Sequence, residues 1–259
     1  MVTPSVGRLI AAEFVGTTIV MLGGPGLIVL ARGDTGRLEL ALGFGLATAI
    51  SIGVIGAVAN PMFSLALWFA RSISGRELGC DVIGQLLGAV FGAALLFGMN
   101  DTTRFAAGVN GYESDGLDEG VDLGFNLSGF SDLGVVLAAE LVFGVIVVAV
   151  LLGAVKEYRS NVATAGFVGS AVALAALFLH DISGVGINPA RSIGMAIFAD
   201  TDPNALAQLW LFVVVPVVAA FAGMLVWLAF DESTVDDTVF NDTPLDSLAN
   251  AVDDTFDPD

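Results

Sequence analysis

Two short motifs occur twice in this sequence at nearly the same spacing, and this internal repeat limits the possible folds more than any other feature. Glu13 and Glu140 each follow a pair of alanines and lie 127 residues apart. Asn60 and Asn188 are each followed by proline and lie 128 residues apart. Because two separate landmarks recur at almost one offset, the chain should contain two copies of one structural unit.

Six apolar stretches are long enough to cross a membrane, which takes about 20 residues. They are Arg8–Ala31, Leu38–Ala59, Cys80–Met99, Leu133–Val155, Val162–Asp181 and Leu206–Phe230. The composition agrees, since 56% of the residues are hydrophobic and only 14% are charged, against about 25% charged in soluble proteins. The sequence therefore predicts an all-α membrane protein.

Two shorter apolar segments, Asn60–Ala70 and Asn188–Ala199, are about half the length of a membrane span. Each opens with Asn-Pro, and proline is favoured at the first position of a helix. We expect two re-entrant half-helices, which a membrane tolerates where protein or water covers the irregular backbone. Three crossings per half require the second half to insert upside down, so an inverted 3+3 repeat should bring the half-helices together near the midplane.

The single cysteine, Cys80, and the single histidine, His180, restrict the chemistry of the chain. One cysteine excludes an internal disulfide or a thiol cluster, and one histidine excludes multi-histidine metal sites. We therefore expect no enzyme activity, no cofactor and no metal.

The net charge of −18 is concentrated in two polar stretches, since seven acidic residues lie within 101–132 and ten within 231–259. Acid-rich, lysine-poor surfaces suit a protein that stays hydrated in concentrated salt, so we expect a halophilic, archaeal source. The same charge argues against a nucleic-acid partner. Residues 231–259 should form a disordered tail, because they are acidic and poor in apolar residues.

Further motifs appear in the same order along the chain. They are Ala12-Glu13-Phe14-Val15-Gly16-Thr17, Asn60-Pro61-Met62, Gln85-Leu86-Leu87-Gly88-Ala89, Glu140, Asn188-Pro189-Ala190-Arg191-Ser192 and Pro216. Together they resemble the major intrinsic protein family, the aquaporins and glycerol facilitators, over residues 8–230. The resemblance implies a right-handed bundle of six transmembrane helices and two half-helices, assembled as a homotetramer. It also implies a passive channel for water, with glycerol and other small neutral solutes left open as permeants.

The resemblance divides the chain into a channel domain, residues 1–230, and the tail. Repeat one would cover 8–99, an external loop 100–132, and repeat two 133–230. Basic residues flanking the spans favour both termini in the cytoplasm. The resemblance implies a multi-pass protein of the plasma membrane. On the inner side would lie Arg8, Arg71, Arg76, Lys156 and Arg159, and on the outer side Arg32, Arg37 and Arg104.

The meeting half-helices would place two positive dipole ends at the centre of a pore, repelling cations but not neutral molecules. Asn60 and Asn188 would cap their helices and each aim an N–H donor at passing water, interrupting a proton wire. Backbone carbonyls in extended conformation would supply acceptors along one wall. These belong to Gly56, Ala57, Val58, Ala59, Gly184, Val185, Gly186 and Ile187.

The resemblance identifies Arg191 as the selectivity-filter arginine, the alternative being an interfacial arginine that snorkels to the surface. The other filter members would be Val185, either Phe44 or Leu40, and either Ala176 or His180. An apolar filter of this kind is wider than a strict water filter.

Burying the side chains of Glu13 and Glu140 in a membrane costs free energy, so each should have a hydrogen-bond partner. In the first interpretation, each glutamate braces the re-entrant loop of its own half by accepting hydrogen bonds from it, and Gln85 is a further structural residue. The alternative is a proton-coupled secondary transporter that uses both glutamates. A third hypothesis is a pore blocked by Met62, which stands where the family usually has alanine, as Val58 stands where it commonly has histidine.

Overall fold

The computed structural model describes residues 5–30, 36–100, 102–112, 132–158, 161–201 and 204–231. Within these ranges the chain is helical and contains no strand. The elements are α1 Val6–Gly23, α2 Pro25–Leu30, α3 Arg37–Ile50, the π-helix η1 Ser51–Ile55, α4 Pro61–Phe69, α5 Gly75–Met99, α6 Thr102–Ala106, α7 Asp132–Glu157, α8 Asn161–Ser183, α9 Pro189–Phe198 and α10 Ala205–Phe230. Most of the predicted external loop and tail, and the flanking Arg32 and Arg159, lie outside the described residues.

Six helical segments have the length and hydropathy to cross a membrane, as the sequence predicts. They are Val6–Leu30, Arg37–Ile55, Gly75–Met99, Leu133–Glu157, Asn161–Ser183 and Ala205–Phe230. The third begins five residues before the predicted Cys80, because Ser74 and Glu77 form a capping box at its start. The all-α fold class is therefore confirmed.

The two predicted half-helices are α4 and α9, each with proline at its first position. The Asn60 side chain accepts a hydrogen bond from the Met62 N–H, and the Asn188 side chain accepts one from the Arg191 N–H. Both asparagines thus cap their helices as expected, satisfying N–H groups that a helix start leaves unpaired.

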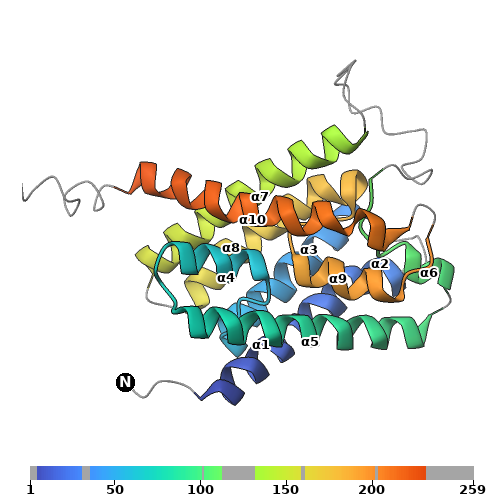
Figure 1. Ribbon diagram of the computed structural model, residues 1–259, viewed down its shortest axis with the longest axis horizontal. Coiled ribbons are helices and arrows are strands. Elements are labelled where there is room, and N and C mark those ends of the chain that lie inside the picture. The colour runs from blue at the N-terminus through green and yellow to red at the C-terminus, as the bar shows by residue number, and fades with distance from the viewer. Residues whose placement is uncertain are drawn as a thin grey trace, which may run out of the picture.

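The helix contacts follow the symmetry that the repeat predicts. In the first half α1 packs against α5, and in the second half α7 packs against α10, while α3 and α8 pack against each other between the halves. Each half-helix contacts the last long helix of the other half, α4 with α10 and α9 with α5. Figure 1 shows α4 and α9 among the long helices, toward opposite ends of the bundle.

Glycine permits the closest helix crossings. A Cβ placed on Gly88 of α5 would lie 2.3 Å from the Phe14 carbonyl oxygen of α1, and one on Gly45 of α3 would lie 2.5 Å from the Gly169 carbonyl oxygen of α8. Backbones can therefore approach at these positions only because no side chain intervenes. The α1–α5 crossing also sets the distance between the polar side chains that the two helices direct inward.

Candidate functional site

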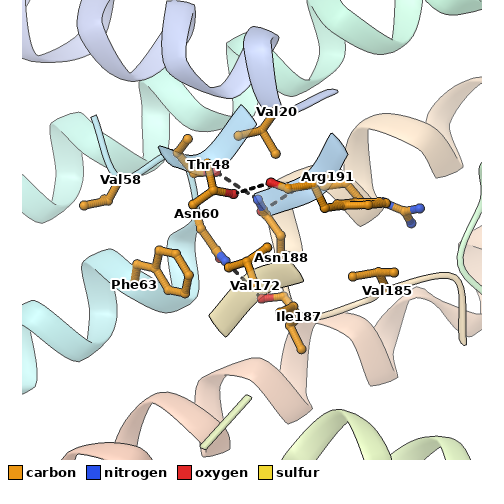
Figure 2. Close-up of a pocket in the computed structure, with 12 residues that line it drawn as sticks. Val20, Thr48, Val58, Asn60, Phe63, Val172, Val185, Ile187, Asn188 and Arg191 are labelled. Carbon is orange, nitrogen blue, oxygen red and sulfur yellow. Dashed lines mark hydrogen bonds between the residues drawn. The ribbon is translucent and has the colours of Figure 1, made fainter. Parts of the chain in front are cut away.

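The N-termini of the two half-helices meet and are joined by reciprocal hydrogen bonds. The Asn60 Nδ2 donates to the Ile187 carbonyl at 3.1 Å, and the Asn188 Nδ2 donates to the Ala59 carbonyl at 2.8 Å (Figure 2). An amide NH₂ group carries two hydrogens, so each asparagine retains one donor beyond this contact. The two helix starts, with their positive dipole ends, are thereby fixed side by side.

A narrow cavity lies around this contact and is named here the pore cavity. Its volume is about 20 Å³, enough to hold a single water molecule. It is lined by Val20, Phe44, Thr48, Val58, Ala59, Asn60, Phe63, Val172, Val185, Ile187, Asn188 and Arg191. Residues of both halves and of both half-helix loops therefore line one common cavity.

A wider hollow, named here the vestibule, has a volume of about 300 Å³. It is lined by Ile52, Gly56, Ala57, Val58, Leu151, Val155, Tyr158, Asn161 and Thr164. Val58 lines both hollows, so the loop before α4 separates the vestibule from the pore cavity.

The loops before the half-helices are not extended throughout, and the prediction of extended backbone was wrong at four of the eight positions. Gly56 and Gly184 have φ angles of 77° and 74°, and Ala59 and Val185 have φ angles of 53° and 67°. Left-handed conformations are unusual for residues with a Cβ, above all for a β-branched valine. In the sequence, only Gly56 and Gly184 indicated a left-handed backbone, and these two glycines lie at equivalent positions of the repeat.

Several of the carbonyls expected to face permeants bond to the protein instead. The Ala57 carbonyl accepts from the Ser51 hydroxyl at 2.8 Å, and the Gly184 carbonyl accepts from the Arg191 guanidinium at 2.8 Å. The carbonyls of Ala59 and Ile187 accept from the two asparagines. Each such oxygen has a second lone pair, so these contacts reduce the acceptor capacity of the wall without removing it.

The two buried glutamates hold the loops of their own halves. The Glu13 carboxylate accepts from the Val58 and Ala59 N–H groups, each at 2.8 Å. The Glu140 carboxylate accepts from the Gly186 N–H at 2.6 Å and from the Ser183 hydroxyl. These are the contacts that the bracing interpretation predicts.

Gln85 connects Glu13, through Ser64, to Asp81, a residue that the sequence analysis did not identify. Its Nε2 donates to Glu13 at 2.8 Å and to the Ser64 hydroxyl at 2.9 Å, and Ser64 donates to Asp81 at 3.0 Å. Asp81 is buried on α5. An acidic residue inside a membrane span is itself a signal of a specific role, and this signal could have identified Asp81.

Arg191 is fully buried, which excludes the snorkelling alternative. Its guanidinium donates to the Gly108 carbonyl at 2.9 Å, to the Gly184 carbonyl and to the Asn110 side chain. Its Cζ lies 6.0 Å from the centre of the Phe44 ring. The cation is thus positioned between the second re-entrant loop and the segment that follows α6.

Asn110 is a second residue that the sequence did not reveal. Its Oδ1 accepts from Arg191 and, at 2.7 Å, from the Ser192 hydroxyl, while its Nδ2 donates to the Ser183 carbonyl at 2.9 Å. Asn110 is buried although it lies in the predicted external loop. An asparagine in a polar loop carries no pattern that indicates such a contact.

Of the alternatives for the filter, Phe44 lines the pore cavity, whereas Leu40 is buried but is not among the lining residues. Val185 also lines it, and α8 contributes Val172. Ala176 is one helical turn from Val172 and is buried in the core.

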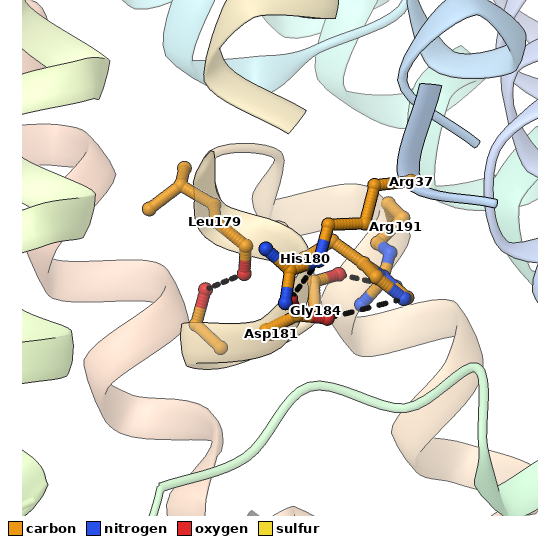
Figure 3. A network of polar contacts seen from close by, with 7 residues as sticks. Arg37, Leu179, His180, Asp181, Gly184 and Arg191 are labelled. Atoms are coloured by element: carbon orange, nitrogen blue, oxygen red, sulfur yellow. Dashed lines mark hydrogen bonds and ion pairs between the residues drawn. The ribbon is translucent and has the colours of Figure 1, made fainter. Parts of the chain in front are cut away.

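His180 lies a further turn along α8, close to Asp181, which forms a 2.5 Å ion pair with Arg37 (Figure 3). Neither Ala176 nor His180 is among the residues that line the pore cavity. The filter position on α8 therefore stays a prediction.

Met62 is not among the described residues that line the pore cavity. Its side chain is fully buried and packs in the core. A Cβ on Gly144 of α7 would lie 3.5 Å from the Met62 sulfur and 2.7 Å from the Ala219 Cβ of α10. The absence of a side chain at Gly144 therefore permits the close approach of α7 to Ala219 of α10 beside Met62.

Comparison with known proteins agrees with this architecture. A family model described as MIP, major intrinsic protein, matches residues 1–227. Aquaporin Z of Brucella melitensis biotype 1 is 33% identical over 233 residues, covering 84% of this chain and 95% of the relative. Aquaporin Z of Photorhabdus laumondii subsp. laumondii is 31% identical over 229 residues, covering 83% and 94%.

A solved structure shares the fold. The X-ray structure of the aquaglyceroporin from Plasmodium falciparum superposes with a TM-score of 0.67 at 21% sequence identity. The match covers 87% of this chain and 95% of that chain. The six-helix arrangement with two half-helices therefore occurs in a protein whose sequence has diverged widely.

Proposed function

Because this chain belongs to the major intrinsic protein family, we propose that it is a passive transmembrane channel for water, with glycerol and other small neutral solutes as candidate permeants. The observation that carries the proposal is the pore cavity between the two half-helix N-termini. It is about the size of one water molecule. The name of the two relatives, Aquaporin Z, supports water as the main permeant.

Exclusion of ions follows from the charges around the pore cavity. Two helix N-termini each contribute roughly +0.5 charge, and the buried Arg191 adds a full positive charge. A cation entering this space would lose its hydration without gaining an acidic side chain among the lining residues. Neutral molecules do not meet this electrostatic barrier.

Exclusion of protons would depend on Asn60 and Asn188. A water molecule beside them can accept from the second N–H of each amide and then directs its own hydrogens away from the asparagines. Water chains on the two sides would be oriented in opposite directions, so a proton could not hop through the centre.

The mixed lining of the pore cavity leaves selectivity between water and larger neutral solutes open. Phe44, Val185 and Val172 present apolar surface, whereas Arg191 presents donors. A lining with one apolar side and one hydrogen-bond donor side suits small solutes that have both apolar C–H groups and hydroxyl groups. We place the protein in the plasma membrane as a homotetramer, with one channel per subunit and both termini in the cytoplasm.

Stopped-flow light scattering on proteoliposomes tests the proposal. Vesicles of equal size with and without protein are exposed to a sucrose gradient, and then to glycerol and urea gradients. Water flux should rise in proportion to the protein content without saturating, and planar bilayers should show no ionic current. Water flux equal to that of protein-free vesicles, in a preparation shown to be helical by circular dichroism, would contradict the proposal.

A further inference from the structure

Val58 occupies a special place along the path. Of the described residues that line the pore cavity and the vestibule, it alone lines both. Its side chain is half-buried. In Figure 2, Val58 lies on the opposite side of Asn60 from Arg191. A molecule moving between the asparagines and the vestibule must therefore pass this valine.

The side chains nearest the pore-cavity side of Val58, those of Phe63 and Val172, are apolar. The vestibule side is mixed, because Ile52, Leu151 and Val155 are apolar whereas Tyr158, Asn161 and Thr164 carry polar groups. Two hydroxyls among the lining residues are already engaged, since Thr48 donates to the Phe44 carbonyl and Thr164 to the Ala154 carbonyl. The polar side chains of Asn60, Asn188 and Arg191 lie beyond Val58.

The position of Val58 is fixed by its backbone. Its N–H donates to Glu13 at 2.8 Å, and so does the N–H of the next residue. The carbonyl of the preceding Ala57 accepts from Ser51. A β-branched side chain also has restricted χ1 freedom. The isopropyl group is therefore held in place from both sides rather than free to swing out of the path.

We propose that Val58 forms the apolar neck that limits permeation and discriminates against polyols. The inference rests on the proposed function. Water passing an apolar constriction gives up hydrogen bonds that the wall does not replace, and such constrictions reduce flux by dewetting. A polyol gives up several hydrogen bonds at once. The neck thus opposes polyols more strongly than it opposes water.

An isosteric exchange isolates polarity from size. Val58→Thr keeps the shape of the side chain and adds one hydroxyl to the neck. We expect it to raise the water permeability per reconstituted subunit by about fivefold, the equivalent of one net hydrogen bond. Its activation energy for water flux should fall. Val58→Ala widens the neck and should raise the ratio of glycerol flux to water flux.

The matched control is Val54, which lies four residues earlier in η1 and is 77% exposed on the outside of the bundle. Val54→Thr and Val54→Ala should leave water and glycerol fluxes at the wild-type values. Stopped-flow light scattering measures all variants after the protein content of the vesicles has been quantified and the helicity checked by circular dichroism.

The water flux of the wild-type protein distinguishes a failure of the Val58 inference from a failure of the proposed channel function. If the wild-type protein conducts water but Val58→Thr and Val58→Ala leave both fluxes unchanged, the neck is not at Val58 and this inference is overturned. If the wild-type protein conducts nothing, the proposed function itself fails. If Val58→Ala misfolds, the isosteric threonine variant still decides the result.

Discussion

Arg191 depends on hydrogen-bond acceptors that come from other parts of the chain. The guanidinium is buried, and its partners come from the second re-entrant loop and from the segment after α6. A buried charge is costly unless it is paired, and Nη1 and Nη2 of Arg191 both donate to protein acceptors. Asn110 therefore acts as a positioning residue for the arginine.

Replacing Asn110 with alanine should leave the Arg191 guanidinium short of an acceptor. Hydrogen bonds to charged groups contribute about 1.5–3 kcal/mol, so we expect a lower melting temperature and a changed ratio of glycerol to water flux. Thermal unfolding in detergent and stopped-flow scattering measure the two effects.

Ser192→Ala is the matched control, because Ser192 donates to the same Asn110 oxygen but does not contact the guanidinium in this network. Its effect on both readouts should be smaller. Equal effects of the two substitutions would show that Asn110 does not act through Arg191.

The buried carboxylates give a second prediction at this scale. Glu13→Ala would leave the Val58 and Ala59 N–H groups without their acceptor, at about 1–3 kcal/mol for each buried group. Glu13→Gln keeps one acceptor oxygen and should lose less. The midpoint of thermal unfolding distinguishes them, and a glutamine variant less stable than the alanine variant would contradict a bracing role.

At the scale of elements, close packing of α1 and α5 aligns Glu13 with Gln85. The contact depends on glycines of α5 that face the α1 backbone. Backbone atoms cannot move aside as flexible side chains do. The helix crossing is therefore more sensitive to an added methyl group than an ordinary surface would be.

Gly88→Ala should be destabilising by roughly 1–3 kcal/mol, since its Cβ would lie 2.3 Å from the Phe14 carbonyl oxygen. Gly98→Ala, on the same helix, has nothing within 4 Å of the added Cβ. The control should be neutral or stabilising by up to about 1 kcal/mol, because alanine favours a helix. Melting temperatures in one detergent compare the pair, and similar values would refute the close crossing.

The elements were predictable to a large extent from the sequence. Asn-Pro and the apolar run after it located α4 and α9 within a residue or two, because capping and proline act locally. The left-handed Ala59 and Val185 were not predictable, since neither residue type favours that conformation. Asn110 became a site residue only through contacts with distant elements, which no local pattern encodes.

For the whole molecule, every described residue that lines the pore cavity or the vestibule precedes α10. The acidic segment 232–259 supplies a third of the acidic residues of the chain, and we infer that it serves hydration rather than permeation.

Removing residues 232–259 should leave water permeability per subunit unchanged, because Asp231, which pairs with Lys156, is retained. Stopped-flow scattering of the truncated and full-length proteins compares the fluxes. Solubility in concentrated salt should fall as acidic residues are lost. A clear change in flux would instead assign the segment a role in regulating the channel.

The reciprocal contacts at the centre of the molecule have a consequence for assembly. Asn60 finds its acceptor in the second half, and Asn188 finds its acceptor in the first. Neither half alone contains the carbonyl acceptor for its own asparagine, so each half needs the other to form these two hydrogen bonds. A polypeptide severed between residues 112 and 132 should regain water transport when both fragments are synthesised together, whereas either fragment alone should be inert.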